Sequence, residues 1–278
     1  MRLGAPVGNW NTLEEWAQLH IEKGYGAAYC PIDANADDRT CEELKNVCQR
    51  HDLVLSEVGA WCNPFDAQKG EENIQYIIGQ LRLADKIGAR CCVNISGSLS
   101  PIWDGPHVEN LTQRTFDAIV KTTQRIIDEA APQNAAFALE PMPWMYPTDA
   151  NSMEQLLKAV NRKQFHVHVD MCNMINSYEK TLQTGALTRD FFARFGNKIG
   201  SVHLKDTIVT PCHLTLHIDE AIPGQGIFDH GALLQECAKL PDVPVMLEHL
   251  ASLAEYDEAR IHVEKVAREN GLSFTRAK

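Results

Sequence analysis

Short apolar runs alternate with longer stretches of mixed polar and apolar residues along the whole chain. The short runs have the length and composition of strands, whereas the longer stretches repeat apolar residues at helical spacing. The pattern predicts strands at 2–7, 26–31, 53–60, 90–95, 135–140, 166–170, 199–204 and 243–248. It predicts helices near 12–23, 37–50, 71–87, 109–131, 151–160, 185–194, 228–239 and 255–270.

This alternation of strands and helices predicts an α/β fold with one parallel sheet, because strand–helix–strand units connect parallel strands by right-handed crossovers. Eight units of about 35 residues fill the 278-residue chain, which is the usual size of a closed (β/α)8 TIM barrel. An open doubly wound sheet is the alternative, but no GxGxxG follows the first strand. We therefore expect residues 1–278 to form one TIM-barrel domain. Residues 205–227 form its longest irregular stretch, which is typical of a lid or a binding loop.

Residues of the metal-binding type end four successive predicted strands. The fifth strand ends in Glu140, the sixth in Asp170, the seventh in His203 and the eighth in Glu248. Because all strands of a TIM barrel end at the same face, these side chains should meet at one rim. Three carboxylates brought together repel one another unless a cation balances them. The mostly oxygen donor set indicates one divalent ion, Mn²⁺ first and Mg²⁺ or Co²⁺ as alternatives, while a metal-free polar network is the other interpretation.

Side-chain alternation along the strands gives two further expectations. If Asp170 points into the barrel, His168 does so as well, as an interior hydrogen-bonding group. By the same parity Lys205 lies on the side of His203, where it either reaches the pocket or pairs with Asp206 at the rim.

Four of the five tryptophans follow predicted strand ends. Trp10, Trp61, Trp103 and Trp144 come after the first, third, fourth and fifth strands. Aromatic walls at a barrel mouth stack on sugar rings or on flat ring systems. We therefore predict that these tryptophans bind substrate, with packing within the loops as the alternative.

A glycine pair at Pro223–Gly226 follows the seventh strand and precedes a helix. Backbone N–H groups at such a turn can bind a phosphate. The alternative is that the glycines serve only the geometry of the loop.

The overall charge and the cysteine content limit the classes of partner and compartment. The chain has 26 Lys and Arg against 37 Asp and Glu, a net charge of -11, so we expect no nucleic acid partner. No apolar run approaches the length of a membrane helix, and the start of the chain does not resemble a secretory signal. The nine cysteines contain no CxxC pair, which favours free thiols in a reducing, cytoplasmic location.

The strand-end residues and their flanking motifs resemble the xylose isomerase-like TIM barrels, in the branch of sugar phosphate isomerases/epimerases and D-tagatose 3-epimerase relatives. The motifs are ALEPMPW, HVHVDMCNMIN, SVHLKD, PGQGIFD and VMLEHL. The resemblance implies that Glu140, Asp170, His203 and Glu248 bind one metal ion. It also implies a carbohydrate substrate on which Glu140 and Glu248 act as the acid/base pair, moving a proton beside a carbonyl through a cis-enediolate.

The chain departs from the ketose epimerases of this branch at two positions. Those enzymes carry a His three residues beyond the Asp ligand, where this chain has Asn173, and an Arg beyond the His ligand, which the segment LKDTIVTPC lacks. Asn173, Lys205 and His213 are the candidates to contact substrate oxygens in their place.

The segments DMCNMINS and MPWMYP are also similar to the larger subunits of C-glycoside deglycosidases. That resemblance implies a metal-dependent lyase acting on 3-oxo-glycosides together with a small β-rich subunit, whereas epimerase relatives are often homo-oligomers. Two other interpretations are an apurinic endonuclease, which the negative charge and the single four-residue set oppose, and a non-catalytic binding role. The isomerase or epimerase is the preferred interpretation.

Overall fold

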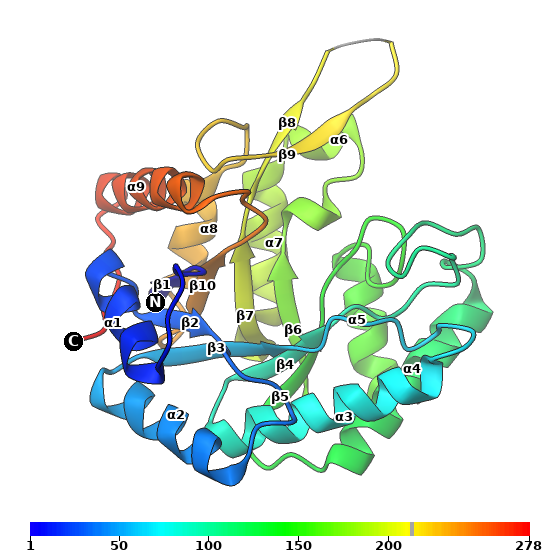
Figure 1. The fold of residues 1–278 in the computed structure, drawn as a ribbon. Coiled ribbons are helices and arrows are strands. Elements are labelled where there is room, and N and C mark those ends of the chain that lie inside the picture. Colours follow the sequence, from blue (N-terminus) through cyan, green and yellow to red (C-terminus); the bar gives the residue numbers. More distant parts are fainter. Residues whose placement is uncertain (212–213) are drawn as a thin grey trace.

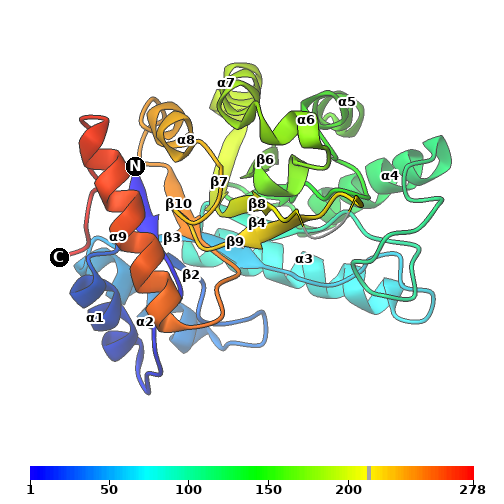
Figure 2. The same cartoon turned by 90° about the horizontal axis from the view of Figure 1, so that it is seen from above.

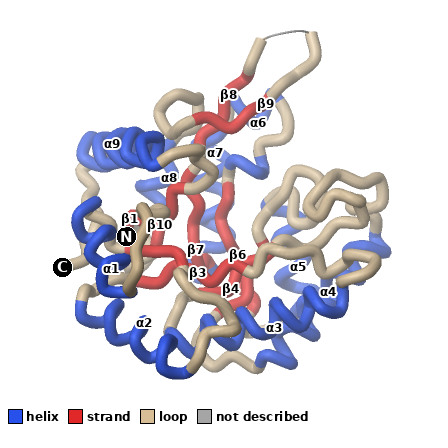
Figure 3. The backbone as a smooth tube through the Cα atoms, in the orientation of Figure 1, coloured by secondary structure: helices blue, strands red, loops and turns tan. Residues whose placement is uncertain are grey.

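Eight parallel strands close into a barrel in the computed structural model, which describes residues 1–211 and 214–278 (Figures 1 and 3). The barrel strands are β1 (Arg2–Gly4), β2 (Ala27–Tyr29), β3 (Val54–Gly59), β4 (Cys91–Asn94), β5 (Ala136–Leu139), β6 (Phe165–Asp170), β7 (Ile199–Leu204) and β10 (Pro244–Leu247). Around the barrel they follow the order β1-β10-β7-β6-β5-β4-β3-β2. Each predicted strand is present, and the predicted single TIM barrel is confirmed.

Helices surround the barrel on its outer face, as the view from above shows (Figure 2). The helices are α1 (Leu13–Lys23), α2 (Asp38–Arg50), α3 (Gly70–Ile87), α4 (Gln113–Ala130), α5 (Ala150–Val160), α6 (Tyr178–Thr181), α7 (Thr184–Phe195), α8 (His230–Cys237) and α9 (Leu253–Glu269). Short 3-10 turns lie at Cys172–Met174 and Gly196–Lys198. All eight predicted helices are present, and the one-turn helix α6 is an addition that the apolar periodicity did not indicate.

Local capping chemistry explains where several helices begin and end. The Thr12 side chain accepts a hydrogen bond from the backbone N–H of Glu15 at the start of α1. Gly24 and Gly88 end α1 and α3 with φ angles of 75° and 77°, in the left-handed region that glycine adopts without a Cβ clash. Capping residues of this kind can be recognised in the sequence, so the predicted helix boundaries lie close to the observed ones.

A hairpin replaces much of the irregular stretch that we expected at 205–227. Strands β8 (Asp206–Val209) and β9 (Ile218–Ala221) pair antiparallel, and the hairpin stands above the carboxyl end of the barrel (Figures 1 and 2). The expectation of an irregular loop was wrong because two four-residue strands carry too few residues for a clear alternation of apolar and polar positions.

The interior of the barrel holds polar side chains beside a small cluster of Cys91, Val93, Ala136 and Ala138, while the main apolar core lies between the strands and the helices. Val167 and Val169 of β6 point outward into a cluster that contains Phe191 of α7. The residue between them, His168, points inward as predicted and bonds through Nδ1 to Ser201 Oγ at 2.7 Å. Alternation along parallel strands therefore delivers polar side chains to the axis beneath the rim.

The remaining sequence expectations concern membranes and thiols. In the part of the chain described, no helix combines the length and the apolarity needed to cross a membrane. The eight cysteines described carry free thiols.

Candidate metal centre and substrate cavity

The four predicted ligand residues converge at the carboxyl end of the barrel. Their strands β5, β6, β7 and β10 are consecutive around it, and the ligand atoms of Glu140, Asp170, His203 and Glu248 all lie within 4.8 Å of one another. His203 Nδ1 is 2.9 Å from Glu248 Oε2 and 3.2 Å from Glu140 Oε1. The spacing of one strand–helix unit between successive ligands is what brings them together.

Burial and neighbouring charges shift the pKa values of Glu140 and His203. Burial raises the pKa of Glu140 to about 7, and the nearby Glu248 carboxylate adds to the rise. Burial by itself would lower the pKa of His203, but the Glu248 and Glu57 carboxylates raise it well above its usual value. The centre therefore gathers more carboxylate charge than a water-free site holds without cations.

The donor set fits a divalent cation. The buried oxygens Asp170 Oδ2 and Glu248 Oε2 face the same small volume as His203 Nδ1, and both form ion pairs with Lys205 Nζ. Three carboxylates and one imidazole match the ligand preference of Mg²⁺, Mn²⁺ or Co²⁺. These four residues are therefore a candidate metal centre.

Lys205 contacts two carboxylates of this centre. Its Nζ is 2.8 Å from Asp170 Oδ2 and 3.0 Å from Glu248 Oε2, and its side chain is only 1% exposed. The sequence left open a pairing with Asp206 at the rim, but the structure pairs Lys205 with the centre's own carboxylates. The ammonium group balances part of their charge and does not line the cavity above the centre.

Glu57 is a member of the site that sequence reasoning missed. It comes from β3, on the far side of the barrel, and its Oε1 lies 3.0 Å from His203 Nε2. Its side chain is 1% exposed, and its Oε2 has no hydrogen-bond partner. The available signal was an acidic residue inside a predicted parallel strand, where a charge is unexpected without a partner.

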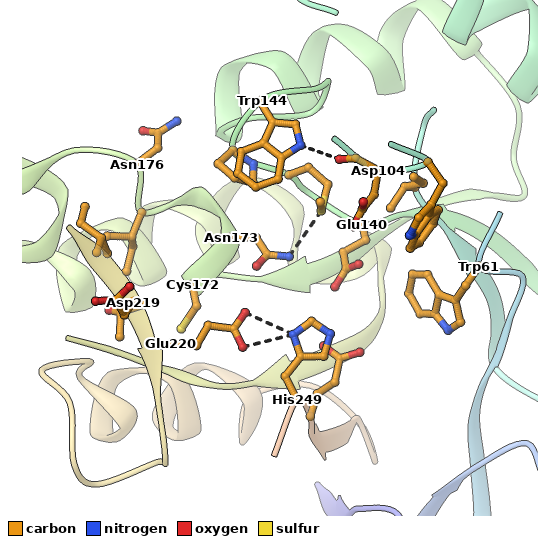
Figure 4. Close-up of a pocket in the computed structure, with 18 of the residues that line it drawn as sticks. Trp61, Asp104, Glu140, Trp144, Cys172, Asn173, Asn176, Asp219, Glu220 and His249 are labelled. Atoms are coloured by element: carbon orange, nitrogen blue, oxygen red, sulfur yellow. Dashed lines mark hydrogen bonds and ion pairs between the residues drawn. The ribbon is translucent and has the colours of Figure 1, made fainter. Parts of the chain in front are cut away.

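A cavity of about 640 Å³ opens above the candidate metal centre (Figure 4). Loops after β3, β4, β5, β6 and β10 contribute to its wall together with the hairpin β8–β9. Its lining residues are Trp61, Ile95, Trp103, Asp104, Glu140, Met142, Pro143, Trp144, Cys172, Asn173, Ile175, Asn176, Thr207, Leu216, Ile218, Asp219, Glu220, Glu248 and His249. Since Glu140 and Glu248 belong to both the centre and the wall, a bound molecule could reach the candidate ligands.

Three of the four predicted tryptophans line this cavity. Trp61, Trp103 and Trp144 are 40%, 44% and 37% exposed. Trp144 Nε1 donates to the backbone carbonyl of Asp104 at 2.6 Å, which fixes one indole ring relative to the neighbouring loop. The centre of the Trp61 ring system lies 6.4 Å from that of the His203 ring, so the aromatic wall extends close to the ligands.

The other predicted substrate contacts have mixed outcomes. Asn173 lines the cavity, and its backbone N–H donates to Asp170 Oδ1 at 3.0 Å. Trp10 does not line the cavity: β1 ends early, at Gly4, and the following loop packs Trp10 against the apolar core. His213 lies outside the described residues.

The turn at 223–226, which contains the glycine pair, binds the carboxylate of Asp206 in the same chain. The backbone N–H groups of Gly224, Gly226 and Phe228 donate to the Asp206 carboxylate at 2.9, 3.0 and 2.9 Å. A Cβ on Gly226 would clash with Asp206 Oδ1, which explains the glycine there. The arrangement agrees with the loop-geometry interpretation, because the turn's donors are already used.

His249 and Glu220 complete the wall, and neither was predicted. His249 Nδ1 lies 3.1 and 3.2 Å from the two carboxylate oxygens of Glu220, a pair that ties β9 to the residue after Glu248 (Figure 4). His249 adopts a φ of 58°, a strained conformation for a side chain other than glycine. The hairpin thus contributes directly to the cavity.

Comparison with known proteins agrees with this architecture. A family model described as the xylose isomerase-like TIM barrel matches residues 20–269. No curated protein matches the sequence.

Several solved structures share the fold at low identity. A xylose isomerase-like TIM barrel protein from Mycobacterium smegmatis, in complex with magnesium, has a TM-score of 0.65 and 17% identity, covering 92% of this chain and 89% of that one. D-psicose 3-epimerase with D-tagatose from Clostridium cellulolyticum has a TM-score of 0.69 and 13% identity, covering 98% and 100%. Endonuclease IV from Thermus thermophilus has a TM-score of 0.73 and 14% identity, covering 97% and 100%. At these identities the likeness shows the fold alone.

Proposed function

The chain belongs to the xylose isomerase-like TIM barrel family, and we propose that it is a divalent-metal-dependent isomerase or epimerase of a sugar or sugar derivative. One observation carries the proposal: Glu140, Asp170, His203 and Glu248 meet within 4.8 Å beneath a cavity that two of them line. The family contains enzymes, and a D-psicose 3-epimerase shares this fold.

The proposed ligands of the metal ion are these four residues. When bound, the ion would polarise a substrate carbonyl and so make the proton on the adjacent carbon more acidic. We propose Mn²⁺ first, with Mg²⁺ or Co²⁺ as alternatives. The magnesium in the Mycobacterium smegmatis structure supports a hard divalent ion without choosing among the three.

The proton transfer is assigned to Glu140 and Glu248. Both carboxylates reach the cavity, so each can contact a carbon that lies beside the carbonyl. One would remove the proton and the other would return it, to the opposite face or to the next carbon. Without a bound ion, burial raises the pKa of Glu140 to about 7, and a divalent cation at the centre would lower it and keep the carboxylate ionised as a base near neutral pH.

The test combines metal analysis with isotope exchange. Purified protein is analysed for bound metal and then incubated with a panel of keto-sugars in deuterated water. We expect about one Mn, Mg or Co per chain and deuterium at the carbon beside the carbonyl. Glu248→Gln should retain the fold and abolish exchange, whereas Glu43→Gln, an exposed acid on α2, should leave exchange unchanged. Wild-type exchange in Glu248→Gln would refute the acid/base assignment.

A lyase acting on a 3-oxo-glycoside is the second candidate, and the aromatic wall favours it. Trp61, Trp103 and Trp144 offer a surface for a flat group attached to the sugar. The same proton removal beside a carbonyl would then lead to expulsion of that group. Release of a free aglycone, together with copurification of a small β-rich subunit, would identify the lyase, while a rearranged sugar and a homo-oligomer would identify the isomerase or epimerase.

A further inference from the structure

The wall of the cavity is acidic. Besides the ligands Glu140 and Glu248, the side chains of Asp104, Asp219 and Glu220 line it, and none of its described lining residues is Lys or Arg. An anionic substrate entering this cavity would therefore meet mostly carboxylates, with His249 as the one basic side chain among the described lining residues.

Two basic side chains at or near the cavity already have carboxylate partners. Lys205 Nζ lies within 3.0 Å of both Asp170 and Glu248, and its side chain is 1% exposed. His249, which does line the wall, is held by both oxygens of Glu220 at 3.1 and 3.2 Å. Neither side chain is free to neutralise a phosphate.

The glycine turn at 223–226, a candidate phosphate site in the sequence, already binds the carboxylate of Asp206. Three backbone N–H groups, those of Gly224, Gly226 and Phe228, donate to Asp206, which is 1% exposed. A phosphate could take these donors only by displacing a buried carboxylate from three charge-assisted hydrogen bonds.

The opposite side of the cavity is apolar and aromatic. Trp61, Trp103 and Trp144 lie between 37% and 44% exposed, and Trp144 is fixed by its hydrogen bond to Asp104. A volume of about 640 Å³ lies in the middle of the range for sites that take drug-sized ligands. The cavity therefore has room for a ring-bearing group in addition to the sugar held at the metal centre.

From these observations we infer that the substrate is an uncharged sugar derivative whose apolar ring packs against the three tryptophans, and that phosphorylated sugars are excluded. The inference rests on the proposed function, since the sugar is placed at the candidate metal centre. It extends that function by assigning the charge of the substrate and the part of it that the tryptophans recognise.

Binding measurements on the metal-loaded protein test this inference separately from turnover. The probes are phenyl β-D-glucopyranoside, methyl β-D-glucopyranoside and glucose 6-phosphate, followed by isothermal titration calorimetry. We expect the phenyl glycoside to bind about two- to tenfold more tightly than the methyl glycoside, as one aromatic contact would give. We expect no binding of glucose 6-phosphate at concentrations that saturate the phenyl glycoside.

Two variants sharpen the result. Trp103→Ala should remove the preference for the phenyl glycoside, while Ile261→Ala, an exposed apolar residue of α9 outside the cavity, should preserve it. Equal binding of phenyl and methyl glycosides, absence of phenyl glycoside binding, or tight binding of glucose 6-phosphate would each overturn the inference. Aryl glycoside binding without any isotope exchange would instead overturn the proposed reaction and leave the ligand class standing.

Discussion

Replacing Glu57 by Gln should weaken metal binding without unfolding the barrel. Glu57 Oε1 lies 3.0 Å from His203 Nε2, while His203 Nδ1 faces Glu140 and Glu248. A carboxylate that accepts the N–H of a metal-binding imidazole fixes the ring orientation and leaves the other nitrogen free for the ion. Gln has the same size but no charge, and its amide can present a donor where the imidazole needs an acceptor.

The expected magnitude follows from the role of this contact. Loss of such a supporting partner typically lowers metal affinity by about 10- to 100-fold, or roughly 1.4 to 2.7 kcal/mol. Removing a negative charge from the centre weakens cation binding in the same direction. The metal-free protein loses a hydrogen bond between charged groups, which costs about 1.5–3 kcal/mol, so the barrel should still fold.

The assay is a Mn²⁺ titration against a competing chelator, combined with nitrogen NMR of the His203 imidazole. Glu57→Gln should bind Mn²⁺ at least about tenfold more weakly than wild type and shift the ¹⁵N resonances of His203. Glu236→Gln is the matched control, because Glu236 is a buried acid of α8 that pairs with Lys239 away from the centre. Wild-type affinity with unchanged His203 resonances in Glu57→Gln would refute the reasoning.

Three further predictions concern protons, charge and backbone. Metal affinity should fall as pH drops, because binding must release the proton that His203 takes up, with its pKa raised well above the usual value, and, below about 7, the proton on Glu140. Measuring proton release in two buffers checks the sign. Lys205→Met should lower the unfolding free energy of the metal-free protein by about 3–5 kcal/mol, since two buried carboxylates lose their cation. Added metal should restore much of this stability, as measured by thermal unfolding. Equal losses of stability with and without metal would contradict this prediction. Gly226→Ala should destabilise the fold by about 1–3 kcal/mol in urea unfolding, because its Cβ would clash with Asp206 Oδ1, and an unchanged midpoint would count against that turn.

The sequence by itself determined the barrel and its four candidate ligand positions. Both follow from a repeat along the chain: each strand–helix unit returns the backbone to the same face, so residues one unit apart at strand ends must meet at one rim. For Glu140, Asp170, His203 and Glu248 the only information needed was the end of each apolar run. The capping residues Thr12 and Gly24 are equally local, which is why the helix limits were predictable.

The tertiary structure decided the contacts that cross the barrel. Glu57 and His203 are 146 positions apart and meet only because closure of the sheet brings β3 opposite β7. The partners of Lys205, the packing of Trp10 against the core and the hydrogen bonds of Asp206 to its glycine turn likewise depend on register, loop length and packing. Periodicity shows which face of a strand a side chain occupies. Barrel closure and strand register decide which of the charged groups on that face come within about 3 Å of one another, and the linear sequence pattern does not contain that information.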